Sequence, residues 1–184
     1  MDTSYLPSVL KQFEYNKSLG DKTFQQLTKE QLFSQYNKES NSVATIVKHI
    51  SGNMLSRWTN FLTEDGEKSW RNRDDEFVNT YNSKEEMLAD WEKGWQCLFD
   101  NLNKITSENS NTIVYIRNEG HTIAEAINRQ LCHYSYHIGQ IVTIGKMSKN
   151  TDWNTLSIAK NASKSYNKEK FAINKSRKHF TEDL

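Results

Sequence analysis

The sequence of 184 residues has little of what interrupts or cross-links a chain: one proline, seven glycines and two cysteines. So few helix-breaking residues favour long helices over many short strands. Cys97 and Cys132 are too few for the disulfide framework of a small secreted protein, and we therefore expect a reducing, cytoplasmic environment. The length fits one domain, or one domain with a tail.

Long apolar runs and a strong excess of one charge are also missing. No apolar stretch approaches the ~20 residues of a membrane span, and no signal-peptide pattern opens the sequence, so no membrane association is expected. The 24 basic and 23 acidic side chains give a net charge of +1, which argues against a general nucleic-acid binder. Seven basic and three acidic residues lie within 160–184. We therefore expect one domain over residues 1–167 and a basic, mainly solubilising tail over 168–184.

Four segments carry apolar residues at helical spacing and begin with suitable capping residues. The expected helices run from about residue 6 into the twenties, from Ser42 to about Gly66, from Ser83 to about Leu102, and from Thr122 to about Met147. The β-branched segment Thr112–Arg117 is predicted to be short and extended. The connection from about Thr63 to Asn82 is long, and the sequence predicts an all-α four-helix bundle with one long crossover.

Three histidines form the pattern that points most directly to chemistry. His133 and His137 are four residues apart, so their rings lie one turn apart on one face of the last long helix. His49 lies near the middle of the second helix and can meet them if the two helices are neighbours. Three neutral imidazoles with open positions are typical of a catalytic metal site. The alternative, that these histidines belong to solvated helix edges, has about equal weight from the residues alone.

Polar side chains accompany the histidines at helical steps. Asn53 and Arg57 follow His49, and the fourth helix carries Glu125, Arg129 and Gln140. Such groups can hold ligand imidazoles in one tautomer or bind a polar substrate. They can equally form the solvated edge of an amphipathic helix.

Two arginines lie in the long crossover, where functional loops concentrate. Arg71 and Arg73 could bind a carboxylate-bearing substrate, because guanidinium groups match carboxylates in shape and charge. Salt bridges to Asp74, Asp75 or Glu76 are at least as well supported.

The segment that ends in HYSYHIGQ, from Asn128 to Gln140, resembles the HxxxHxxQ helix of the DinB/YfiT superfamily of bacterial four-helix, divalent-metal-binding proteins. The third ligand of that superfamily is a histidine on the second helix, which matches His49 here. Residues 57–74 and 156–160 are similar to a branch of unassigned function, although the usual proline of that branch is replaced by Ala159. The resemblance extends over about residues 5–168.

The resemblance implies an up-down-down-up arrangement of the helices, a homodimer, and a divalent ion on His49, His133 and His137. Zn²⁺ or Ni²⁺ is the expected ion, with Mn²⁺ and Fe²⁺ as alternatives. Characterised relatives use the metal with a low-molecular-weight thiol, such as bacillithiol or mycothiol, in transfer or isomerisation reactions. Because protons compete with a metal for imidazole, affinity should fall near the ordinary histidine pKa of ~6.5.

Three functional hypotheses follow. The first is a metal-dependent enzyme that activates a thiol or water for transfer to, or hydrolysis of, a small substrate. The second is a non-catalytic metal-binding or stress-associated dimer in which the ion braces the bundle. A DNA-associated role through the basic tail is a third alternative, which the near-zero net charge disfavours.

Overall fold

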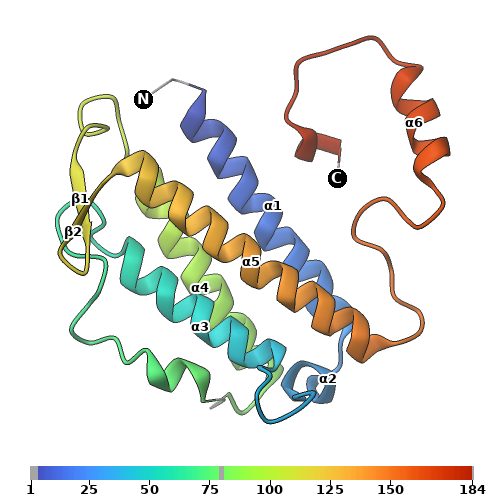
Figure 1. Cartoon of the computed structure of the whole chain (residues 1–184), viewed down its shortest axis with the longest axis horizontal. Coiled ribbons are helices and arrows are strands. Elements are labelled where there is room, and N and C mark those ends of the chain that lie inside the picture. The colour runs from blue at the N-terminus through green and yellow to red at the C-terminus, as the bar shows by residue number, and fades with distance from the viewer. Residues whose placement is uncertain (1–3, 79–80, 184) are drawn as a thin grey trace.

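The computed structural model describes residues 4–78 and 81–183 and is mostly helical, with one small sheet (Figure 1). The all-α expectation is therefore confirmed in its broad form. The helical elements are α1 (Tyr5–Gln26), α2 (Lys29–Phe33), α3 (Val43–Trp58), η1 (Asp74–Phe77), α4 (Lys84–Leu102), α5 (Ile123–Lys149), α6 (Ser163–Phe171) and η2 (Phe180–Asp183). The strands β1 (Ile113–Ile116) and β2 (Glu119–Thr122) pair in antiparallel fashion.

The four long helices lie side by side: α3 packs along α4, α1 packs along α5, and α3 also contacts α5 (Figure 1). Aromatic side chains fill the space between them. Trp58, Trp91 and Trp95 are fully buried. Gly94 permits the close approach of α3 and α4, because a Cβ atom there would lie 3.0 Å from the Cα of Ser51.

The capping residues set the helix starts as the sequence predicts. The Ser42 hydroxyl accepts a hydrogen bond from the Thr45 backbone N–H at 3.0 Å and begins α3. Thr122 and Glu125 form a reciprocal capping box at the start of α5. These caps set where α3 and α5 begin, and all three histidines lie on these two helices.

The predicted end of the second helix was wrong. Helix α3 ends at Trp58, because Thr59 is extended and Asn60 adopts a left-handed conformation with φ of 50°. Gly66 lies in the crossover instead, where its N–H donates to the carbonyl of Tyr115 at 2.7 Å. The early end of α3 lengthens the crossover, whose segment η1 packs against α3.

The crossover is fastened to the β-hairpin. The extended segment predicted at 112–117 is present as β1, but its partner β2 was not anticipated. Arg117 and Asn118 form the turn with positive φ values of 55° and 61°, as a two-residue hairpin requires. The carboxylate of Asp65 accepts both of their backbone N–H groups at 2.8 Å. The hairpin tip is thus held beside the crossover.

The C-terminal residues return to α1. Helix α6 extends across the predicted boundary at residue 167, and that boundary stays a prediction. Beyond it, Glu182 forms a salt bridge with Lys11. The rings of Phe180 and Tyr15 pack edge to face, with 5.3 Å between their centres. Within residues 4–78 and 81–183, no helix is long and apolar enough to cross a membrane.

Candidate metal centre

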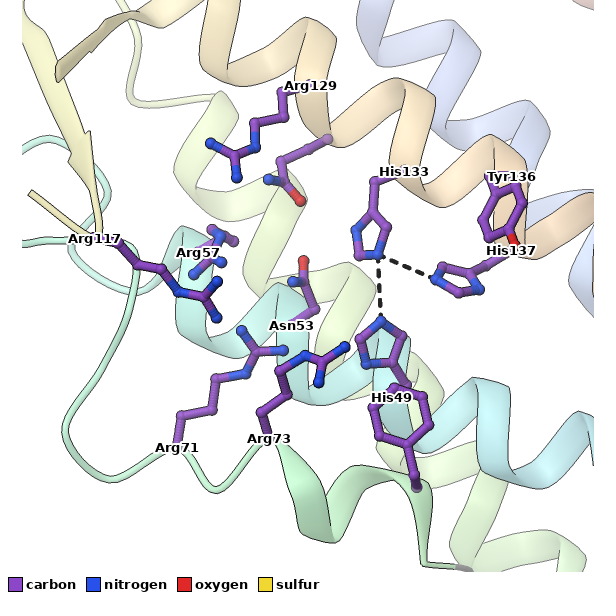
Figure 2. A pocket seen from close by; sticks show the side chains of 12 residues that line it. His49, Asn53, Arg57, Arg71, Arg73, Arg117, Arg129, His133, Tyr136 and His137 are labelled. Carbon is purple, nitrogen blue, oxygen red and sulfur yellow. Dashed lines mark hydrogen bonds between the residues drawn. The ribbon is translucent and has the colours of Figure 1, made fainter. Parts of the chain in front are cut away.

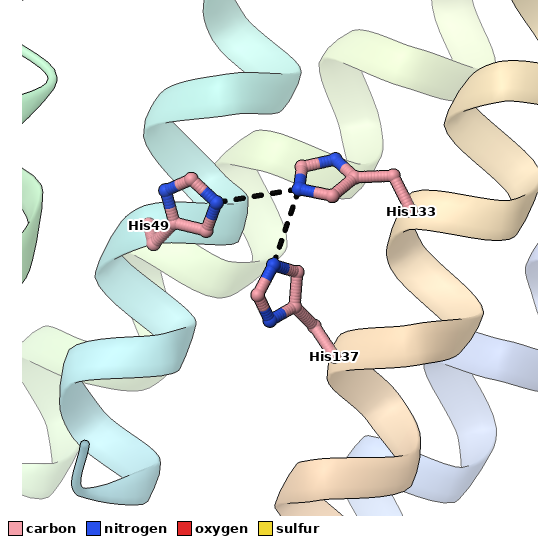
Figure 3. Close-up of side chains that lie close together, drawn as sticks. All are labelled: His49, His133 and His137. Carbon is pink, nitrogen blue, oxygen red and sulfur yellow. Dashed lines mark hydrogen bonds between the residues drawn. The ribbon is translucent and has the colours of Figure 1, made fainter. Parts of the chain in front are cut away.

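The three predicted ligands converge between α3 and α5 (Figure 3). The Nε2 atom of His133 lies 3.3 Å from Nε2 of His49 and 3.1 Å from Nε2 of His137. One ring nitrogen from each residue lies within 4.8 Å of the others. His49 is buried, and the two histidines of α5 are partly exposed. The cluster therefore has a closed side on α3 and an open side toward solvent.

This arrangement fits a divalent ion. Metal–nitrogen bonds of about 2.0–2.1 Å in tetrahedral geometry place neighbouring nitrogens about 3.3–3.4 Å apart. The two short separations around His133 approach that value. Neutral imidazoles suit several first-row ions, so the donor set does not select one metal.

Hydrogen bonds at the far side of two rings select the tautomer that a metal needs. The Nδ1–H of His49 donates to Oε2 of Glu76 at 2.9 Å, and the Nδ1–H of His137 donates to Oε1 of Gln140 at 2.8 Å. Each bond leaves the lone pair on Nε2, which faces the centre of the cluster. Gln140 was predicted for this role, whereas Glu76 was considered only as a partner for the crossover arginines.

Glu76 lies in η1 and is almost completely buried against α3. Burial by itself raises the pKa of its carboxyl group, but hydrogen bonds from His49 and Arg71 outweigh that effect and hold the pKa below its usual range. Arg71 binds both carboxylate oxygens, with Nε at 2.7 Å and Nη2 at 2.9 Å. Of the two roles considered for Arg71, substrate binding and a salt bridge, the structure shows the salt bridge, with Glu76.

Gly52 makes room for that carboxylate. A Cβ atom at this position of α3 would lie 2.5 Å from Oε1 of Glu76. A glycine in the middle of a helix is unfavourable unless packing requires it. Its position three residues after His49 is the sequence signal that could have indicated a group packed against this face.

The histidines of α5 resist protonation. Burial, and then the nearby His137, His49, Arg57 and Arg71, lower the pKa of His133 to about 3. Burial also lowers the pKa of His137, although the hydrogen bond to Gln140 opposes it. Both imidazoles therefore stay neutral, and able to bind a metal, at lower pH than an ordinary histidine.

Asn53 and Arg57, predicted beside the histidines, both line the adjoining pocket. The Oδ1 of Asn53 accepts from the buried Tyr134 hydroxyl at 3.0 Å, and that hydroxyl accepts from Nε1 of Trp58 at 3.1 Å. Arg57 donates to the carbonyl of Gly66 and lies 3.1 Å from Oε2 of Glu67. These contacts tie the pocket wall to the aromatic core and to the crossover.

The structure does not bring Glu125 to the cluster. Its Oε2 accepts from the backbone N–H and the hydroxyl of Thr122, both at 2.8 Å, so this carboxylate caps α5. Arg129, one turn further along, does line the pocket, and its Nη1 lies 3.2 Å from Nε2 of His121.

A pocket of about 430 Å³ opens beside the three histidines (Figure 2). Phe77 lines part of it, and its ring stacks on that of His49 with 4.8 Å between the ring centres. Tyr136 lies at the open side and is 63% exposed. The volume is sufficient for a small molecule in contact with the histidine cluster.

One family model matches the chain: "Protein of unknown function (DUF1572)" matches residues 1–162. No curated protein and no solved structure matches it. The matched range contains the three histidines, Glu76 and every residue that lines the pocket beside them.

Proposed function

The chain belongs to the family described as protein of unknown function (DUF1572), and we propose that this member is a divalent-metal-dependent enzyme acting on a small molecule. The observation that supports the proposal is the convergence of three histidine Nε2 atoms. In His49 and His137, a hydrogen bond at Nδ1 selects the tautomer that leaves Nε2 unprotonated. The resemblance to the DinB/YfiT superfamily supports it further. The pairing of α1 with α5 and of α3 with α4 is compatible with the up-down-down-up bundle of that superfamily, which forms part of the proposal.

The proposed chemistry is transfer of a thiol, or hydrolysis, at a small and electrophilic substrate. A divalent ion bound by neutral imidazoles keeps its full charge and lowers the pKa of a bound thiol or water toward neutrality. The residues of the chain would hold this centre. Glu76 and Gln140 orient two of the rings, and the Phe77 ring keeps water from one face of His49.

A second candidate is a non-catalytic centre that braces the protein. His49 lies on α3, whereas His133 and His137 lie on α5, so one ion would link two long helices. The homodimer implied by the resemblance is compatible with either candidate, and sedimentation of the purified protein tests it.

Comparison of the wild type with His133→Ala tests both candidates. Zn²⁺ or Ni²⁺ should bind the wild type and should be lost from the variant, while His179→Ala, outside the cluster, should keep it. Conjugation of a low-molecular-weight thiol to a model electrophile should require the bound ion. Metal-dependent stability without any thiol or ester turnover would favour the bracing role. Failure of the wild type to bind any divalent ion would exclude both.

The pH dependence of metal retention provides an independent check. Because the pKa values of His133 and His137 are lowered, protons should compete less for these rings than for ordinary imidazoles. The ion should therefore remain after dialysis at about pH 6, slightly below the ordinary histidine pKa of ~6.5. The expectation from sequence, that affinity falls near the ordinary histidine pKa, is the alternative outcome of this measurement.

A further inference from the structure

Five arginines surround the pocket beside the histidines, and Figure 2 shows their side chains directed toward one common space. They come from four separate parts of the chain. Arg57 lies on α3, Arg71 and Arg73 on the crossover, Arg117 in the hairpin turn, and Arg129 on α5. Like charges repel, so five arginines around one pocket require negatively charged partners.

Two of the five arginines belong to the framework of the protein. Arg71 is held by both oxygens of Glu76, and its Nη1 lies 3.3 Å from Oε2 of Glu67. Arg57 contacts the same oxygen of Glu67 and the carbonyl of Gly66. Both side chains are almost completely buried, and both have a carboxylate partner.

The other three arginines are exposed and poorly neutralised. Arg117 lies 3.3 Å from Oε2 of Glu67, an oxygen that already serves Arg57 and Arg71. Arg73 forms a long ion pair with Asp74, at 3.9 Å, and that carboxylate is 96% exposed. Among the residues that the structure describes, no carboxylate forms a salt bridge with Arg129.

Two buried polar atoms in the same wall also lack partners. Over the described ranges 4–78 and 81–183, neither Nε of Arg57 nor Oε1 of Gln130 has a hydrogen-bond partner. The two residues are 6% and 4% exposed and both line the pocket. Buried polar groups are normally satisfied, and those left unsatisfied often mark the place of a ligand.

We propose that this pocket binds the oxyanion of a small substrate, a phosphate or carboxylate group, through Arg73, Arg117 and Arg129. Guanidinium groups bind such oxyanions with paired, charge-assisted hydrogen bonds. The Arg73 guanidinium lies 5.0 Å from the centre of the Phe77 ring, which stacks on His49, so the anion would be held next to the metal ligands. This inference names a substrate class for the proposed function. Anion binding itself does not depend on that function; only the reaction of the substrate at the metal does.

Anion binding can be measured without any metal. Calorimetric titration of the full-length, chelator-treated protein would use inorganic phosphate, succinate as a dicarboxylate, and uncharged succinamide as the control. The variants are Arg129→Gln and Arg73→Gln, which alter exposed side chains, and the matched control is Arg177→Gln in the C-terminal segment. Thermal unfolding followed by circular dichroism confirms that each variant is folded.

The wild type should bind phosphate or succinate saturably and should not bind succinamide. Each pocket variant should weaken that binding by about 10–100-fold, the usual range for losing a hydrogen bond to a charged group. Arg177→Gln should bind like the wild type. A preference for phosphate or for succinate identifies the oxyanion. Absence of saturable binding, or equal affinity in wild type and both pocket variants, would overturn the inference.

The same proteins separate this inference from the proposed function. His133→Ala should lose metal and keep anion binding, whereas Arg129→Gln should lose anion affinity and keep metal. Anion binding by a protein that takes up no metal would reject the metal-dependent enzyme alone. Metal binding without anion binding would reject the oxyanion site alone.

Discussion

Nδ1 of His49 lies 2.9 Å from Oε2 of Glu76, so a carboxylate in the crossover orients a histidine on α3. The same carboxylate binds Arg71 through both oxygens. One buried acid thereby joins the proposed metal centre to the arginine-lined pocket. Its removal should affect both sites.

Glu76→Gln should weaken metal binding by about 10–100-fold, the usual range for loss of a group that orients a metal ligand. The amide can still accept from His49, but the charge that strengthens this bond and balances Arg71 is gone. Competition with a chromophoric chelator measures the affinity. Glu125→Gln is the control, because that carboxylate caps α5 away from the cluster. Equal affinities for the two variants would contradict the orienting role of Glu76.

Gly52→Ala should destabilise the protein by about 1–3 kcal/mol, because the added methyl group overlaps the Glu76 carboxylate. Gly139→Ala is the matched control: this glycine is also inside a helix, and a Cβ atom there would meet nothing within 4 Å. The control should gain up to about 1 kcal/mol from improved helix propensity. Urea unfolding of the metal-free proteins measures both changes, and a gain in both would show that the Glu76 carboxylate tolerates the methyl group.

Acid should destabilise the metal-free protein through His133. The pKa of this residue is about 3 in the folded protein, below the ordinary ~6.5 expected after unfolding. Between these values the unfolded chain binds the extra proton, so stability falls as the pH falls, by at most about 1.4 kcal/mol per pH unit for one such group. Urea unfolding of wild type and His133→Gln at several pH values measures the slope. The variant should lose less stability on acidification than the wild type, and parallel profiles would be inconsistent with a lowered pKa.

Asp65→Ala should loosen the hairpin tip, because the backbone N–H groups of Arg117 and Asn118 lose their acceptor. We expect faster amide hydrogen exchange at these two residues and, if the oxyanion site is correct, weaker phosphate binding. Asp100→Ala, which removes an exposed carboxylate from α4, is the control. Unchanged exchange at Arg117 would mean that the hairpin holds its place without Asp65.

Local rules predicted the helix starts, and they placed His133 and His137 on the face of α5 that meets His49. The start of α3 at Ser42 and the capping box at Thr122 depend on side chains within three residues. The spacing of His133 and His137 places both rings on one face of α5 for the same local reason. Such features are encoded within one or two helical turns, and so the sequence alone reveals them.

Three features of the site and of the fold were missed or misjudged. Glu76 reaches His49 across 27 residues of chain, and no periodic pattern marks it. The polar ladder of α5 suggested Glu125 for the site, but its carboxylate turns back to the cap of its own helix. Helix α3 ends at Trp58, because Asn60 adopts a left-handed conformation. The prediction from sequence had instead placed the end of this helix at Gly66. A tertiary contact decides the first case, whereas the cap of α5 and the backbone conformation of Asn60 decide the other two.

The contact of Asp65 with the hairpin turn makes the crossover and the β-hairpin a single unit. A shift of the hairpin tip would be transmitted through Asp65 and Gly66 to the crossover segment that carries Arg71 and Glu76. Substitutions in one connection should therefore require compensation in the other. Among related sequences, we expect the crossover and hairpin to covary while the histidine-bearing helices stay constant.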